Sequence, residues 1–191
     1  MSGSKKILLI ERCTQDVKVL DEAATGDKKY LHFEAEVQRA DYKNRNGRVY
    51  PRAVLEREVA SIQKRIEEKT AFGEGDHPSA LPSVSRTGVL WEKVWMEQDG
   101  RVMGRAKVLE TQVGKDIRAI IEGGGRIGIS SRANGTVRSG TWRGVEGRED
   151  VAEIVNEDLE LRTFDVVVDP SVETASVNRT FVEQKGAANI M

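Results

Sequence analysis

Alternating apolar and polar positions predict β-strands along most of this 191-residue chain. The clearest run is residues 30–40, where Leu31, Phe33, Ala35 and Val37 alternate with polar side chains. A period of two puts successive side chains on opposite faces of a strand, so we expect the apolar set to face the core. The same reasoning, with turn-forming residues between the runs, predicts further strands at residues 5–11, 84–97, 101–109, 126–135, 151–161 and 163–168.

Two stretches with an apolar spacing of three to four residues predict amphipathic helices. Pro51 suits the first helical position, and apolar residues at 55, 59, 62 and 66 predict a helix from Pro51 to Lys69. The same spacing predicts a second helix from Val113 to Glu122, which ends at the glycines that follow. The chain therefore reads as an α+β protein, mostly antiparallel, with two main helices packed outside the strands.

Polar stretches rich in glycine, proline or acidic residues predict the connections. Asn134-Gly135 is expected to form a tight turn, and the region after it to be an excursion without strands. We expect a single domain over residues 1–181 and a frayed tail over residues 182–191. The predicted loops lie at residues 41–50, 71–82 and 136–150.

The composition and net charge of the chain indicate which classes of partner and which compartment to expect. The chain has 30 basic and 31 acidic residues, a net charge of −1, so nucleic acid and membrane are not expected partners and a polypeptide fits better. Its single cysteine, Cys13, excludes an internal disulfide, and the apolar run before it is too short for a signal segment or a membrane span. We therefore expect a soluble protein in a reducing compartment.

Ser130 is the first candidate for chemistry, because it follows an apolar run at the end of a predicted strand. A serine held by a rigid element can act as a nucleophile if a base and an orienting acid reach it. Ser131 is the rival, and on a strand its side chain points to the opposite face. Serine pairs are also common at ordinary turns and sheet edges, so that interpretation stays open.

His77 is the candidate base. The chain has two histidines, and His32 falls on the polar face of the strand at residues 30–40, where we expect it to face solvent. Elimination leaves His77, which lies in a loop. A turn histidine with no catalytic role remains the alternative.

Asp165 is the favoured orienting acid because it interrupts a β-branched run and would be buried there. A structural salt bridge would explain it equally well. Glu74 and Asp76 are rivals because they flank His77, and the three residues could also be a weak metal-ligand set.

Four motifs in this order resemble the prohead core proteases of tailed bacteriophages, distant relatives of herpesvirus assemblin. They are NRNGRVYP at residues 44–51, GEGDHP at residues 73–78, GISSR with a nearby glycine at residues 128–135, and DVVVDPS at residues 165–171. The resemblance implies a serine endopeptidase with His77 as base and Ser130 as nucleophile, and no cofactor. It also implies a partly orthogonal antiparallel β-barrel with helices outside.

The same resemblance implies a place of action and substrates. Such a protease is packaged inside the immature phage head in the host cytoplasm, cleaves scaffold and major capsid proteins there, and trims itself. Cleavage after glutamate would call for a cation, for which Arg132 is a candidate, and dimers occur among the herpesvirus relatives. A catalytically inactive, scaffold-binding component of the same fold is the alternative.

Two departures from the family pattern concern the site. Gly75 stands where relatives have an apolar residue, and Ala133 stands where they have a glycine that could serve the oxyanion site. We expect the oxyanion donors among the backbone N–H groups of residues 131–135, which include Ser131, Arg132 and Gly135.

Overall fold

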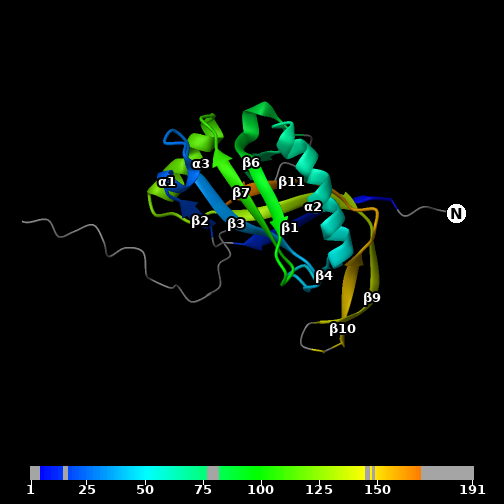
Figure 1. Ribbon diagram of the computed structural model, residues 1–191. Coiled ribbons are helices and arrows are strands. Elements are labelled where there is room, and N and C mark those ends of the chain that lie inside the picture. The colour runs from blue at the N-terminus through cyan, green and yellow to red at the C-terminus, as the bar shows by residue number, and fades with distance from the viewer. Residues whose placement is uncertain (1–4, 15–16, 77–81, 145–146, 148, 169–191) are drawn as a thin grey trace, which may run out of the picture.

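The computed structural model describes residues 5–14, 17–76, 82–144, 147 and 149–168 (Figure 1). The helices in this part are α1 (Glu22–Thr25), α2 (Arg52–Glu67) and α3 (Gln112–Glu122), with a 3-10 turn at Val84–Arg86. The strands there are β1 (Ile7–Thr14), β2 (Val17–Leu20), β3 (His32–Arg39), β4 (Arg48–Val49), β5 (Phe72–Glu74), β6 (Thr87–Met96), β7 (Arg101–Val108), β8 (Gly128–Gly135), β9 (Val137–Arg143), β10 (Glu149–Val155) and β11 (Glu160–Val167).

The strands of the described residues form three sheets. Their orders are β2-β3-β7-β6-β5, β1-β8-β11 and β4-β10-β9, and all pairs are antiparallel except β4 with β10. A single parallel bridge between Gly75 and Val166 links the first sheet to the second. The expected mixed, mostly antiparallel α+β class is confirmed, but within this part of the chain the sheets do not close into one barrel.

Trp91, on β6, joins the five-stranded sheet to the sheet β1-β8-β11 through the core. Its ring meets Phe33 of β3 and Phe164 of β11 edge to face, with centroid distances of 6.0 and 5.4 Å. Its indole N–H donates to the Phe164 carbonyl at 2.9 Å, which satisfies a buried polar group. The five-stranded sheet and the sheet that contains β11 therefore share one core, in which Trp91 packs between Phe33 and Phe164.

Helix α2 matches its prediction and runs beside the sheets (Figure 1). The side chains that it buries recur at helical spacing: Val54, Leu55, Glu58, Ile62 and Ile66. Arg57 donates to the carbonyls of Glu157 and Leu159, and Arg65 donates to those of Leu161 and Arg162. These bonds attach α2 to the start of β11.

Two expectations about turns and loops are wrong. Residues 136–150 include all of β9 and the first two residues of β10, and these two strands form a hairpin that extends away from the other sheets (Figure 1). Asn134-Gly135 belongs to β8 and makes no tight turn. A Cβ at position 135 would come within 3.2 Å of Leu159 Cα, so this glycine permits close backbone approach.

Segments expected as connections also contain short regular elements. Residues 17–20 form β2, and residues 22–25 form α1. Helix α1 forms there because the Asp21 side chain accepts from the Ala24 N–H and Gly26 ends the turn at a φ of 67°. The expected tail at residues 182–191 lies outside the described residues. No helix among those described is long and apolar enough to cross a membrane.

Candidate active site

Ser130 lies in the middle strand of the sheet β1-β8-β11 and is fully buried. Its register partners are Arg12 on β1 and Asp165 on β11. Residues directly opposite one another in antiparallel strands point to the same face, with Cβ atoms about 5 Å apart. Ser130 and Asp165, 35 positions apart in the sequence, are therefore neighbours on one face.

The two serine hydroxyls have different partners. Ser130 Oγ donates to the Glu11 carbonyl at 2.8 Å, whereas Ser131 Oγ accepts from Gln38 Nε2 at 3.0 Å. Gln38 belongs to β3, which packs on β8, so Ser131 points into the interior between the two sheets. Only Ser130 shares a face with Asp165.

Cys13 also donates to the Glu11 carbonyl, with Sγ 3.1 Å from the oxygen. Burial raises the pKa of this thiol to about 12. A thiol is nucleophilic only as the thiolate, so Cys13 is inert at neutral pH.

Arg132 joins two buried carboxylates on the face of Ser130. Its Nη2 lies 2.7 Å from Glu74 Oε2 and 3.1 Å from Asp165 Oδ1, and its Nε lies 3.0 Å from Asp165 Oδ2. All three side chains are almost completely buried. A cation already neutralised by two carboxylates is poorly placed to bind a substrate glutamate, so the structure argues against Arg132 as the specificity cation.

Burial raises the pKa of Asp165 from 3.8 to about 6. The Glu74 N–H, which donates to Oδ1 at 3.1 Å, and the Arg132 guanidinium lower this pKa, while the Glu74 charge raises it. Asp165 Oδ2 accepts no hydrogen bond from the described residues, because Arg132 Nε is close but misaligned. That oxygen therefore keeps the capacity to accept a hydrogen bond from a further donor.

Residues 74–76 run along the edge of β11. Gly75 bridges Val166 in parallel, and the Asp76 N–H donates to the Val166 carbonyl at 2.8 Å. Asp76 has a φ of 62°, in the left-handed region that turns the chain away. His77 comes next and lies outside the described residues.

The rival acids differ in exposure. Glu74 is 1% exposed and accepts from the Ser83 N–H at 2.6 Å in addition to Arg132. Asp76 is exposed to solvent. Among the described residues, no cluster of three or more His, Cys, Asp or Glu side chains could hold a metal ion.

The expected oxyanion donors, residues 131–135, lie within strand β8. Strand β8 pairs with β1 on one side and β11 on the other, which commits its N–H groups to the two ladders. Gly135 pairs with Ile7, five residues and roughly 17 Å along the strand from Ser130. The structure argues against oxyanion donors from residues 131–135.

His32 is not exposed to solvent, and that expectation is wrong. It lies on the face of β3 opposite Phe33, as its alternation predicts, yet it is only 3% exposed. Its Nε2 is 3.5 Å from Glu92 Oε2 and its Nδ1 is 3.2 Å from the Tyr30 carbonyl. Neighbouring side chains cover this face, so solvent exposure is no ground for eliminating His32.

Glu11 is the residue that sequence reasoning missed. It is 1% exposed and bonds to four side chains of the segment 44–50. A signal was available, because Ile7, Leu9 and Glu11 share one face of a strand and a carboxylate on an apolar face needs partners.

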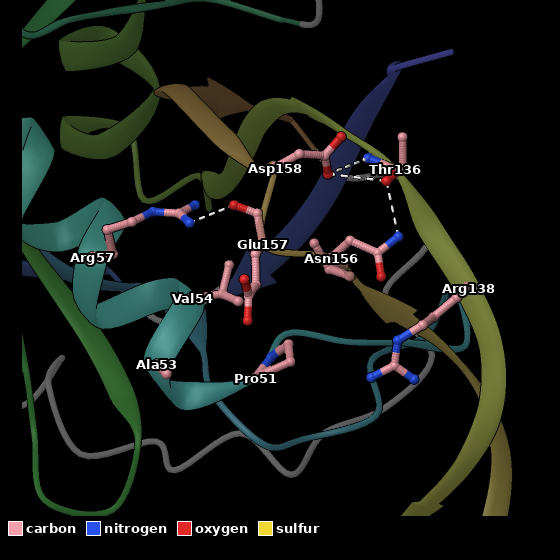
Figure 2. A pocket seen from close by; sticks show the side chains of 10 residues that line it. Pro51, Ala53, Val54, Arg57, Thr136, Arg138, Asn156, Glu157 and Asp158 are labelled. Carbon is pink, nitrogen blue, oxygen red and sulfur yellow. Dashed lines mark hydrogen bonds between the residues drawn. The ribbon is translucent and has the colours of Figure 1, made fainter. Parts of the chain in front are cut away.

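A hollow of about 950 Å³ lies elsewhere, at the N-terminus of α2 (Figure 2). It is lined by Pro51, Ala53, Val54, Arg57, Thr136, Arg138, Val155, Asn156, Glu157 and Asp158. Among the candidate catalytic residues that the structure describes, Ser130 and Asp165, neither lines it.

The fold and this site define a mixed α+β protein with a serine, two carboxylates and an arginine buried at one sheet. The profile of the family described as "Prohead core protein serine protease" matches residues 9–186. The chain belongs to this family of prohead core proteases, which are proteins of bacteriophage capsid assembly.

Two similar proteins come from bacteriophage T4. The "Prohead core protein protease" of Enterobacteria phage T4 is 33% identical over 157 residues, which cover 80% of this chain and 70% of that protein. The solved structure of the bacteriophage T4 capsid assembly protease superposes with a TM-score of 0.73 at 30% identity. That match covers 86% of this chain and 99% of the solved one.

Proposed function

We propose that this chain is a serine endopeptidase in which Ser130 is the nucleophile, His77 the base and Asp165 the orienting acid. The observation that carries the proposal is the pairing of Ser130 with Asp165 on one sheet face, beside the segment that leads to His77. The Asp76 N–H is bonded to Val166, next to Asp165.

Peptide cleavage would begin at the Ser130 hydroxyl. In the resting state the Ser130 hydroxyl donates to the Glu11 carbonyl, which holds Oγ in one position. A hydroxyl has one hydrogen, so this donation would pass from the carbonyl to the imidazole as the reaction begins. The base then takes the proton as Oγ attacks the substrate carbonyl, and later returns it to the leaving amine.

Asp165 would stabilise the imidazolium that forms in this step. Its Oδ2 is the oxygen with capacity for a further donor, and Arg132 beside it favours the ionised carboxylate. Glu74 is the weaker candidate because the Ser83 N–H and Arg132 already occupy its two oxygens. Exposed Asp76 is weaker still, since water would screen its charge.

The substrates and setting remain part of the proposal. Scaffold and capsid proteins inside the immature head, in the host cytoplasm, are the expected targets, because the family is that of the prohead core proteases. Cleavage after glutamate, assembly into homo-oligomers and the wider kinship with herpesvirus assemblin stay as proposals. An inactive scaffold-binding protein of the same fold is the competing function.

Incubation with scaffold protein separates these functions. Wild type and Ser131→Ala should cleave the scaffold, whereas Ser130→Ala and His77→Ala should not, with losses of at least about a thousandfold. Fragments are measured by electrophoresis and intact mass. Equal cleavage by Ser130→Ala and wild type would contradict the assignment, and a wild type that binds scaffold without cleaving it would favour the inactive component.

Self-cleavage near Glu183 is a separate prediction. Mass spectrometry of the wild type after incubation should show loss of the C-terminal segment, and Ser130→Ala should keep it. An intact wild-type tail beside cleaved scaffold would contradict self-trimming while leaving the peptidase assignment in place.

A further inference from the structure

Glu11 accepts hydrogen bonds from four side chains. Oε2 accepts from Asn44 Nδ2 at 2.8 Å and Asn46 Nδ2 at 2.6 Å. Oε1 accepts from Arg48 Nη1 at 2.9 Å and the Tyr50 hydroxyl at 2.8 Å. Each oxygen thus uses both of its acceptor positions, and every donor comes from one seven-residue segment.

The protonation states suit this arrangement. Burial and the adjacent Glu11 charge raise the pKa of Tyr50, so its hydroxyl stays a donor. The Arg48 guanidinium compensates the Glu11 charge, and the Glu11 carboxylate raises the pKa of Arg48. A buried carboxylate bonded in this way is held in one position.

The backbone of the same residue meets the candidate nucleophile. The Glu11 carbonyl accepts the Ser130 hydroxyl at 2.8 Å, and this is the hydrogen bond that the structure gives to Oγ. Glu11 also pairs with Ser131 in the β1-β8 ladder. Glu11 therefore accepts hydrogen bonds from the segment 44–50 at its carboxylate and from Ser130 at its backbone carbonyl.

We propose that Glu11 is a positioning residue for the nucleophile: the segment 44–50 fixes its carboxylate, and its carbonyl thereby fixes the Ser130 hydroxyl. This inference rests on the proposed role of Ser130. It assigns to the motif Asn44–Tyr50 a function in the site, although these residues bond to Glu11 rather than to Ser130, Asp165 or Arg132.

Replacement of Glu11 by glutamine tests the proposal, because the side chain keeps its shape while one oxygen becomes an NH2 group that faces two donors. Glu11 would shift, and Ser130 would lose its fixed acceptor. We expect the rate of Ser130 labelling by a fluorophosphonate and the kcat for scaffold cleavage to fall about tenfold or more. KM should stay within about twofold, because Glu11 is buried, at 1% exposure, and offers no surface to a substrate.

Tyr50→Phe is the milder variant, since it removes one donor and keeps the ring in the core. It should reduce both rates by a smaller factor. Glu58→Gln is the matched control: Glu58 is also a buried glutamate, 6% exposed, but it bonds to Arg57 and the Leu161 N–H. It should lower Tm as Glu11→Gln does while leaving labelling unchanged.

The outcomes separate this inference from the function on which it rests. Wild-type labelling rates in folded Glu11→Gln and Tyr50→Phe would overturn it, and so would faster labelling, which would make the contact a restraint on the nucleophile. If the labelling rate fell as much in Glu58→Gln as in Glu11→Gln, lost stability would explain the effect and the inference would be wrong. Cleavage by Ser130→Ala would overturn the inference and the proposed function together.

Discussion

The pKa of Asp165 depends on its burial, on the Arg132 guanidinium and on the Glu74 carboxylate. Its folded pKa of about 6 lies above 3.8, the value for the free side chain. Between these values the folded chain binds more protons than the unfolded chain, so the contribution of Asp165 to stability falls as pH rises through about 6. Among the described residues, the Arg132 guanidinium contacts this carboxyl group, and the Glu74 carboxylate acts on it through its charge.

Asp165→Asn should reveal this dependence, because asparagine resembles the protonated acid at every pH. The free energy of unfolding of the wild type, relative to Asp165→Asn, should decrease between about pH 5 and about pH 7.5. Urea unfolding of both proteins at the two pH values measures it. A constant difference would mean that the carboxyl titrates below this range.

At the scale of elements, the contact between β5 and β11 holds residues 74–76 beside Asp165. Gly73 allows that contact, since a Cβ there would lie 2.4 Å from the Phe164 carbonyl oxygen and 2.7 Å from Val89 Cγ2. The Phe164 carbonyl is backbone and already bonded to Trp91, so it has little freedom to move.

Gly73→Ala should therefore destabilise the protein by about 2 kcal/mol or more, through overpacking. Gly140→Ala on β9 is the control, because the nearest atom to its added Cβ is the end of the Ile154 side chain at 3.0 Å. Thermal unfolding compares the two variants. Equal Tm values would show that β5 and β11 can separate at little cost.

Across the whole molecule, stability should be uneven. Strand β8 is almost completely buried and is paired on both sides. The β9–β10 hairpin has many exposed side chains and extends away from the other two sheets (Figure 1). Local opening requires less free energy where fewer buried contacts break.

Amide hydrogen exchange should therefore be slowest in β8 and in the strands paired with it, β1 and β11. It should be at least about tenfold faster in β9 and in residues 149–151 of β10. Mass spectrometry of peptides after timed labelling resolves these segments. Equal protection of the hairpin and β8 would indicate that the hairpin is covered in solution, for example by another copy of the chain.

Local periodicity determined the longer, regular elements of this protein. The alternation in β3 and the helical spacing in α2 and α3 are repeated over many residues, so the apolar face of each could be predicted before any packing was known. Four short motifs also led to the right family, because their order along the chain is specific. Ser130 and Asp165 were likewise identifiable as unusual polar residues in apolar strands.

Tertiary structure decided which polar groups meet. The burial of His32, the pairing of Arg132 with two acids and the bonds to Glu11 all join residues from different elements. Periodicity gives the face on which a side chain lies, but the neighbours that cover that face come from distant parts of the chain. For the same reason the Asn134-Gly135 pair, which by itself predicts a turn, lies in a strand: Leu159, from a distant part of the chain, packs closely against Gly135.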